Sequence, residues 1–375
     1  MGINNKLLKN FLILFAILPL LLSGCSKARN NQNIVIGVAW PMASNNSLFK
    51  EGVDLAVDEL NQKGGVNGHK LDIIMSDDEG SVDKGMSVAQ TFAENKDMVA
   101  VIGHRNSSVS IPASRIYEDA GKLMLSPAST APELTQQGYK FVFRNIPSDD
   151  EITRQLAIYA AQAGHKRMVI YYSDDSYGRG LANSFEDHAN KEGIYIVDRV
   201  SYYGKLSDLE RLQQKWKALD FDGIFVAQAM PGGAEFIADA GKVGITVPFI
   251  GGNAMDSPML NNIAGKYAEG TVIGTIFNPN DPRPEVATFV KKFQQKYNQM
   301  PTSYSAQGYD AVKLLAAAIE QANSTDPSLI AEQLHKFKDW PGVAGYHTFN
   351  DSGDDVGKLV VKKVLHNGQF EYLDH

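Results

Sequence analysis

The chain has 375 residues, of which 43% are hydrophobic, and 36 basic against 43 acidic side chains give it a formal net charge of −7. This length exceeds what one hydrophobic core usually serves, so we expect two lobes. The acidic balance, with no basic patch, argues against nucleic acid as a partner.

The first residues have the features of an export signal. Lys6 and Lys9 precede an apolar run over residues 11–22, which is too short to span a bilayer. The run ends in Leu-Ser-Gly-Cys, which resembles a bacterial lipobox, and Cys25 is the only cysteine, so it cannot form a disulfide within the chain. We therefore expect a lipoprotein signal peptide over residues 1–24 and a tether over residues 25–32 that carries lipid on Cys25. The mature protein would be exported and anchored to a bacterial membrane, in the periplasm or on the outer face of the cell.

From residue 33 the apolar pattern alternates between strands and helices. The predicted strands are residues 34–39, 71–75, 98–102, 122–125, 141–144, 168–172, 195–200, 223–227 and 248–251. The predicted helices are residues 49–60, 86–93, 150–163, 180–191, 207–218, 231–242, 284–297 and 308–322. Strands separated by helices imply parallel sheets with right-handed crossovers. A turn-rich break at residues 145–150 divides the alternation, so the predicted fold class is α/β with two doubly wound, parallel-sheet lobes.

Two polar loops follow predicted strands, where sheets of this class bind ligands. One is residues 126–135, in which Thr130 and Glu133 have the spacing of a helix capping box; the other is residues 103–108. The unpaired N–H groups of a helix N-terminus attract a carboxylate. The alternative is that Thr130 only caps its helix.

Together these two loops resemble the ligand-binding loops of the branched-chain amino-acid-binding family of ABC-importer receptors, and the similarity extends over nearly the whole mature chain. The resemblance implies a type I periplasmic-binding-protein fold with a hinge of three crossings, near Pro147, Asn278 and Ala344. Residues 33–147 with 279–344 would form the first lobe, and residues 148–278 with 345–375 the second. Such lobes close around a ligand by rigid-body rotation.

The same resemblance implies a binding site. Ser107 and Thr130 would hold a ligand α-carboxylate, and the Ala128 carbonyl with the Thr130 hydroxyl would take the α-ammonium. Ser129 would supply backbone groups, and Tyr177 would close over the ligand from the second lobe. The alternative for Tyr177 is a tyrosine packed under its loop.

The second lobe departs from the family pattern. Asn253 stands where the family usually has an Asp or Glu that pairs with the ammonium. Either Asp256, three residues later, replaces that acid, or the ligand lacks a free ammonium. Arg105 lies in a loop that is usually uncharged in the family, which favours a ligand with extra negative charge, unless the arginine is simply solvated.

No motif for common enzyme classes is present, and the eight histidines have no metal-ligand spacing. His104 is expected to bond loop backbone, and the acidic turn at residues 77–79 to be solvated or to cap a helix. We therefore expect a binding protein and not an enzyme, with no metal and no cofactor.

The predicted function is an extracytoplasmic lipoprotein that captures a small amino-acid-like solute, a branched-chain amino acid by resemblance. It would act as a monomer and present its ligand to an ABC permease and its ATPase. The alternative is a sensor of the same fold that binds an amide or a small carboxylic acid without a transporter.

Overall fold

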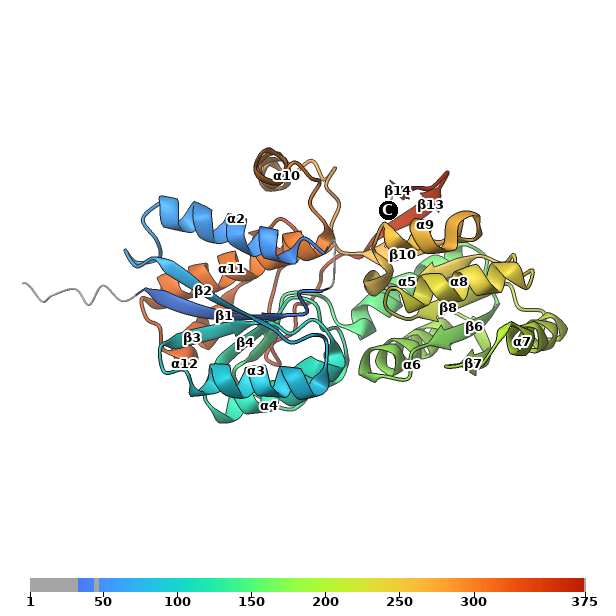
Figure 1. The fold of residues 1–375 in the computed structure, drawn as a ribbon, viewed down its shortest axis with the longest axis horizontal. Coiled ribbons are helices and arrows are strands. Elements are labelled where there is room, and N and C mark those ends of the chain that lie inside the picture. The colour runs from blue at the N-terminus through green and yellow to red at the C-terminus, as the bar shows by residue number, and fades with distance from the viewer. Residues whose placement is uncertain (1–32, 44–46, 374–375) are drawn as a thin grey trace, which may run out of the picture. The chain divides into compact units, whose positions relative to one another are not determined.

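A computed structural model describes residues 33–43 and 47–373 of the chain (Figure 1). The predicted signal peptide, the predicted lipidation site Cys25 and the tether lie outside these residues. Within the described part, no helix is both long and apolar enough to cross a membrane.

The first sheet is entirely parallel and has the strand order β2-β1-β3-β4-β5. Its strands are β1 (Ile34–Trp40), β2 (Leu71–Asp77), β3 (Met98–Ile102), β4 (Leu123–Ser126) and β5 (Val142–Arg144). Because the strands are parallel, the loops that follow β3 and β4 leave the same edge of the sheet, which brings the two predicted ligand loops together.

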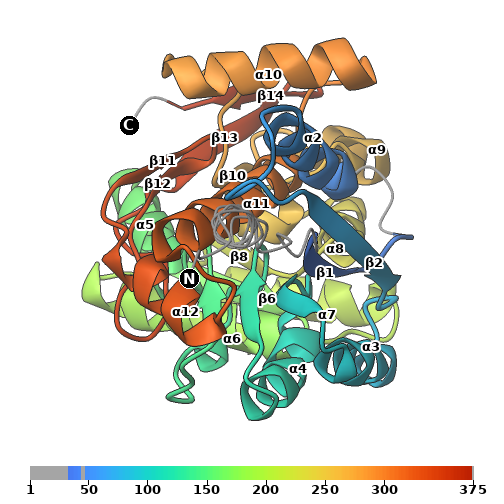
Figure 2. The same ribbon diagram turned by 90° about the vertical axis from the view of Figure 1, so that its left-hand side faces the viewer.

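Helices cover both faces of this sheet. They are α2 (Phe49–Gln62), α3 (Val82–Glu94), α4 (Ser107–Asp119), α11 (Ser303–Ala322) and α12 (Pro327–Lys336). Helices α2, α11 and α12 share one core with the sheet, in which Ile36 packs with Val53 and Leu315. Helices α3 and α4 lie on the opposite face (Figures 1 and 2), where Val101 packs with Ala113. Both faces of the strands are therefore buried, as in doubly wound folds.

The second sheet has the order β14-β13-β10-β9-β8-β6-β7, and its last two strands in the chain run antiparallel to the others. Its strands are β6 (Arg167–Tyr172), β7 (Tyr195–Val200), β8 (Gly223–Ala227), β9 (Phe249–Gly251), β10 (Val272–Thr275), β13 (Val361–His366) and β14 (Gln369–Tyr372). Its helices are α5 (Asp149–Gln162), α6 (Ser176–Lys191), α7 (Leu206–Ala218), α8 (Gly232–Lys242) and α9 (Met259–Ala264). Helices α5 and α6 pack on one face and α7, α8 and α9 on the other. The predicted α/β class with two helix-covered sheets is confirmed.

The segments after residue 280 return to the first sheet before the chain ends in the second. Helix α10 (Pro284–Tyr297) packs beside α2 through Phe289 and Leu55. Helix α11 begins at Ser303, five residues before the predicted start, and lies so close to α2 that a Cβ on Gly52 would be 2.0 Å from the Ser305 carbonyl oxygen. A glycine is therefore required at this crossing.

The stretch after residue 344 contacts the first sheet before the chain joins the second. It begins within a hairpin that was not predicted, formed by β11 (Trp340–Gly342) and β12 (Gly345–His347). Phe349 belongs to the core of the first sheet, and the Gly353 carbonyl accepts a hydrogen bond from the backbone of Arg144. The chain pairs with the second sheet only from Val361 onward. The two-lobe division with its three crossings stays a prediction, but these contacts argue for a last crossing later than residue 344.

A buried group of charges lies where the chain passes between the two sheets, and we call Asp310, His347, Asp355 and Lys358 the hinge cluster. The His347 ring nitrogens lie 2.7 Å from Asp355 and 3.1 Å from Asp310. Lys358 donates to the carbonyl of Asn145, 3.1 Å away, just after β5. Both ring nitrogens face carboxylates, so both must carry protons to donate, and His347 is an imidazolium in this arrangement.

Burial and the Lys358 ammonium lower the pKa of His347, but Asp355 and Asp310 outweigh them and leave this pKa above its ordinary value. A raised folded-state pKa contributes stability that is complete below the unfolded value of about 6.5 and is lost as the pH rises through the folded value. We predict that His347→Gln lowers the free energy of unfolding by roughly 3 kcal/mol or more near pH 6, because it leaves buried carboxylates without their cation.

Denaturant unfolding over a pH series would measure this effect. The gap between wild type and His347→Gln should narrow as the pH rises above the folded-state pKa of His347. His366→Gln is the matched control, since His366 pairs with Glu269 at an exposed site. A gap that stays constant with pH would contradict a charged His347.

Candidate functional site

The loop after β4 is held by one buried arginine. The Arg144 side chain is completely buried at the end of β5. It donates to the carbonyls of Ser129 (3.2 Å) and Ala131 (3.0 Å) and to the Thr135 hydroxyl (2.6 Å). The Asp354 carboxylate lies 2.6 Å from its Nε and balances the charge. The guanidinium therefore fixes the path of the backbone on both sides of Thr130.

The predicted capping box in this loop is wrong. Only a short 3-10 turn, η2 (Pro132–Leu134), follows β4, and Ala131 occupies its N-cap without a side-chain hydrogen bond. Thr130 is fully buried, and its hydroxyl has no hydrogen-bond partner among the described residues. Because the loop is held by Arg144 and not by a helix cap, the Thr130 hydroxyl is available to form a hydrogen bond with a ligand.

Hydrogen bonds of His104 stabilise the loop after β3. Its ring lies 2.6 Å from the Asp78 carboxylate and 3.1 Å from the Tyr117 hydroxyl, and its carbonyl accepts a hydrogen bond from the Ser129 hydroxyl at 3.2 Å. The expectation that His104 bonds loop backbone through its ring is therefore wrong, and so is that of a solvated Asp78, which is buried. Ser129 also donates to the Arg105 carbonyl at 3.1 Å, so its hydroxyl joins the two loops.

Most of the predicted ligand-binding residues line one small pocket of about 100 Å³. From the first sheet come Ser107, at the start of α4, and Ala128; from the second come Tyr177, in the first turn of α6, and Asn253, in a 3-10 turn after β9. Arg105 also lines it. Groups from both sheets thus converge on one place.

The side chains around this pocket carry polar atoms with no hydrogen-bond partner in the described part of the chain. The Tyr177 hydroxyl and the Asn253 side-chain carbonyl oxygen belong to residues that line the pocket, whereas the Thr130 hydroxyl and both carboxylate oxygens of Asp149 belong to buried residues that do not line it. Unsatisfied buried polar groups are unfavourable and are few in native proteins, so each needs an explanation. A polar ligand that supplies donors and acceptors here would satisfy them.

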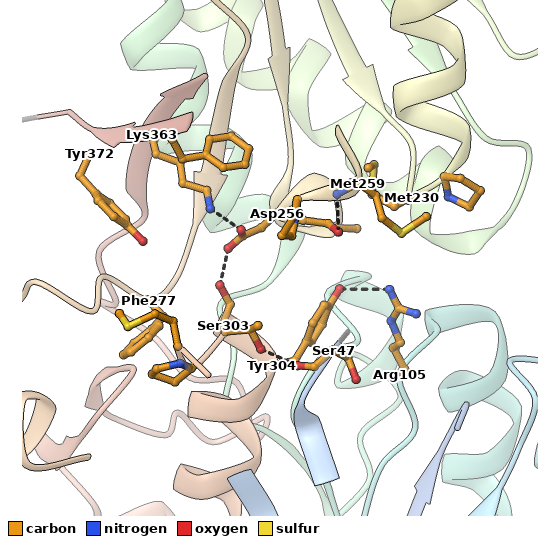
Figure 3. A pocket seen from close by; sticks show the side chains of 18 of the residues that line it. Ser47, Arg105, Met230, Asp256, Met259, Phe277, Ser303, Tyr304, Lys363 and Tyr372 are labelled. Atoms are coloured by element: carbon orange, nitrogen blue, oxygen red, sulfur yellow. Dashed lines mark hydrogen bonds and ion pairs between the residues drawn. The ribbon is translucent and has the colours of Figure 1, made fainter. Parts of the chain in front are cut away.

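A larger cavity of about 570 Å³ adjoins the pocket (Figure 3). Arg105, Met230, Ala254 and Tyr304 line both spaces. The Arg105 guanidinium lies 5.0 Å from the centre of the Tyr304 ring and donates to its hydroxyl at 3.5 Å. Arg105 therefore lines both spaces and is not a solvated surface residue.

Asp256 lines the larger cavity and not the small pocket. It forms an ion pair with Lys363 of β13 and accepts a hydrogen bond from Ser303 (Figure 3). It also accepts a hydrogen bond from the Thr275 hydroxyl. Burial alone would raise the pKa of Asp256, but Lys363 and these hydroxyls lower it below its ordinary value. The carboxylate is thus already neutralised, which argues against Asp256 as the substitute for the acid absent at residue 253.

Several contributors to the site were not predicted from the sequence. Arg144 was read as the end of a strand and Asp149 as part of a turn-rich break. Asp149 precedes Ile152 and Leu156 at helical spacing, so it lies on the buried face of α5. That spacing was the one available signal of a buried acid. Tyr304 and Lys363 carried no signal, because only the tertiary structure brings them to the cavity.

Residues 33–358 match the family described as periplasmic binding protein. The chain belongs to this family. Homologues of this kind are solute-binding proteins and not enzymes, and the family implies an exported protein. Among the described residues, no group of His, Cys, Asp and Glu side chains is arranged to hold a metal ion.

Within this family, the chain is similar in sequence to Leu/Ile/Val-binding proteins. The Leu/Ile/Val-binding protein of Escherichia coli is 30% identical over 352 residues, which are 93% of this chain and 95% of the relative. Leu/Ile/Val-binding protein homolog 1 of Brucella suis is 31% identical over 331 residues, or 86% of this chain and 87% of the relative. The predicted resemblance to branched-chain amino-acid-binding proteins is confirmed.

Solved structures agree with the predicted fold. An ABC-transporter substrate-binding protein from Desulfitobacterium hafniense in complex with Leu has a TM-score of 0.85 and 55% identity, and covers 91% of this chain and 100% of its own. The leucine-binding protein LivK of Thermotoga maritima has a TM-score of 0.83 and 28% identity. The match covers 91% of this chain and 98% of LivK. The chain therefore has the type I periplasmic-binding-protein fold.

The buried ion pair beside the larger cavity can be tested by a double-mutant cycle. Lys363→Met should lower the free energy of unfolding by roughly 3–5 kcal/mol, because Asp256 would stay buried without a cation. The double variant Asp256→Asn with Lys363→Met should be more stable than Lys363→Met alone. Lys362→Met, on the same strand, is the control. Thermal and denaturant unfolding would measure wild type, Asp256→Asn, Lys363→Met, the double variant and the control. Strictly additive effects of the two single substitutions would contradict the pairing.

Proposed function

We propose that the chain is the lipid-anchored receptor of an ABC importer and that it captures a small amino acid, with branched-chain amino acids as the leading ligands. Two further partners belong to this proposal, a permease with its ATPase and a membrane reached through lipid on Cys25. The protein would act outside the cytoplasm as a monomer.

One observation carries the proposal. Ser107 and Ala128 from the first sheet and Tyr177 and Asn253 from the second line a pocket of about 100 Å³. The Tyr177 hydroxyl and the Asn253 side-chain oxygen have no hydrogen-bond partner among the described residues. A zwitterion loses its water when it is enclosed, and it needs donors and acceptors in return. Because the groups come from both sheets, a ligand gains all of them only when the two sides approach each other around it.

The first-sheet loops would bind the α-carboxylate and α-ammonium. Ser107 and Thr130 would donate to the carboxylate, and the Ala128 carbonyl would accept from the ammonium. Such charge-assisted hydrogen bonds contribute about 1.5–3 kcal/mol each. Ser129 would act through its backbone, because its hydroxyl already joins the two loops. Tyr177 and Asn253 would complete the pocket from the second sheet.

An apolar ligand side chain can leave this pocket toward the larger cavity. Met230, Ala254 and the Tyr304 ring border both spaces, so a short hydrocarbon chain would meet apolar walls. The complex of the Desulfitobacterium hafniense protein with Leu supports leucine as the first ligand to test.

The first test removes one hydroxyl. Thr130→Val keeps the volume of the side chain and should weaken leucine binding by roughly 1–3 kcal/mol, because a ligand charge would lose a partner. The free protein should keep its free energy of unfolding within about 1 kcal/mol, since this buried hydroxyl makes no hydrogen bond of normal geometry among the described residues. Thr130→Ser, which retains the hydroxyl, is the control.

Isothermal calorimetry with leucine, isoleucine, valine, short amides and aromatic acids would measure these affinities. If wild-type protein binds amides or carboxylic acids and no amino acid, the ligand is one of these compounds and not an amino acid. Equal leucine affinity of wild type and Thr130→Val would show that the first-sheet site is misplaced.

The second test concerns the anchor. If Cys25 carries lipid, the full chain expressed in a bacterium should fractionate with membranes, and Cys25→Ala should be unprocessed or released. Stable anchoring requires more than one acyl chain, so we expect multiple acylation. Ser26→Ala is the control and should behave as wild type. Equal solubility of wild type and Cys25→Ala would contradict the lipoprotein assignment.

A further inference from the structure

The proposed amino-acid ligand brings a positive charge for which the pocket offers no buried acid. Asp175, which lines the pocket, is exposed and accepts a hydrogen bond from the Gly178 N–H at 2.8 Å as the N-cap of α6. Asn253 can accept a hydrogen bond but carries no charge. Asp256 is committed to Lys363 and lines a different cavity. An ammonium enclosed without a countercharge is unfavourable by several kcal/mol. Some other acid must therefore neutralise it if the ligand is an amino acid.

Asp149 lies in direct contact with the loop that would bind the ligand. It is the first residue of α5 and is completely buried. Its backbone N–H donates to the Thr130 carbonyl at 2.7 Å. Its side chain faces the start of α6, where a Cβ placed on Gly180 would lie 3.3 Å from Oδ2. The carboxyl group thus sits between Thr130 and the helix that carries Tyr177.

The free protein leaves this carboxyl group unsatisfied. Neither of its oxygens, nor the Thr130 hydroxyl beside it, has a hydrogen-bond partner of normal geometry among the described residues. The charged groups that face it are Arg144 from β5 and Asp175 from the start of α6, with the Tyr177 hydroxyl close by. Arg144 is already engaged by loop carbonyls, Thr135 and Asp354. A buried acid without a committed cation is suited to receive one from a ligand.

We propose that Asp149 supplies the negative charge for the α-ammonium of a ligand bound at Thr130. This inference rests on the proposed function and narrows its ligand class to molecules with an ammonium group next to the carboxylate. Asn253 then acts only as a neutral hydrogen-bond acceptor. The site selects against acids of the same shape that lack the amino group, because they would leave Asp149 buried and unpaired.

The ionisation of Asp149 provides a readout independent of packing. Burial raises the pKa of Asp149 to about 7, although the Thr130 hydroxyl and the Arg144 guanidinium oppose this rise. A ligand ammonium lowers that pKa, so binding releases a proton from the fraction of Asp149 that is protonated. Release should be about half a proton per ligand near pH 7, should approach one near pH 6 and should be small near pH 8. Leucine affinity should fall correspondingly as the pH decreases below 7.

The experiment is calorimetry of the mature wild-type domain with leucine and with 4-methylpentanoate, its analogue without the amino group. Titrations from about pH 6 to pH 8, in pairs of buffers with different ionisation enthalpies, measure the protons released. Asp149→Asn should weaken leucine about tenfold or more, should abolish proton release, and should leave 4-methylpentanoate unchanged or tighter. Asp150→Asn is the matched control, since Asp150 is the exposed neighbour that contacts His188 at 2.9 Å.

The outcomes are distinguishable. Tight leucine binding by wild type, with no proton release and with equal affinity in Asp149→Asn, would overturn this inference and leave the proposed function intact. Failure of wild type to bind any amino acid would overturn the proposed function and this inference with it. If Asp149→Asn does not fold, proton release and the preference of wild type for leucine over 4-methylpentanoate still decide the question.

Discussion

The site depends on the buried guanidinium of Arg144. A fully buried arginine is stable only where its donors and its charge are satisfied. Here the carbonyls of Ser129 and Ala131, the Thr135 hydroxyl and the Asp354 carboxylate satisfy them. The same contacts fix the backbone on both sides of Thr130. The loop is therefore rigid before any ligand arrives, and its unpaired polar atoms are held in place at no further loss of chain entropy on binding.

Buried polar contacts also connect the two sheets. Ser303, at the start of α11, donates to Asp256, in the loop after β9, and Lys358 of the hinge cluster donates to the Asn145 carbonyl. Such contacts specify particular geometries, because a buried charge that loses its partner is strongly unfavourable. If the two sheets move relative to each other when a ligand binds, these contacts are the places where one set of partners would be exchanged for another.

The two cavities have different chemistry. Both spaces share Arg105, Met230, Ala254 and Tyr304. The small pocket adds the polar groups of Ser107, Tyr177 and Asn253, whereas the larger cavity adds the Asp256–Lys363 ion pair and Phe277. Polar groups of a ligand are recognised where donors and acceptors are fixed, and a side chain is accommodated where the walls are apolar and roomier. This division fits the proposed ligand class. The small pocket would bind the α-carboxylate and α-ammonium that all amino acids share, and the larger cavity would accommodate different side chains.

The sequence predicted the alternation of strands and helices, because the periodicity of apolar residues is local and strong. It also determined the two polar loops at strand ends, since the carboxyl ends of parallel strands share one edge of a sheet. The likeness to a family predicted Ser107, Ala128, Tyr177 and Asn253 as ligand-binding residues. These four line the small pocket, and their role in binding stays a prediction. The end of the chain was less predictable, and α12 and the β11–β12 hairpin were missed, because short elements there are stabilised by packing on distant segments.

Which polar side chains have hydrogen-bond partners and which have none could not be predicted from the sequence, because those partners come from distant parts of the chain. Thr130 and Glu133 have the spacing of a capping box, yet Arg144, a residue of another strand, replaced that cap with a buried network. Asp256 looked available beside Asn253, but Lys363, more than a hundred positions later, already neutralises it. Asp149 was read as part of a turn-rich break, and the packing of α5 against α6 buries it. Hydrogen bonding and charge pairing are short-ranged in space but not along the chain, so the partners of a polar side chain are known only once the chain has folded.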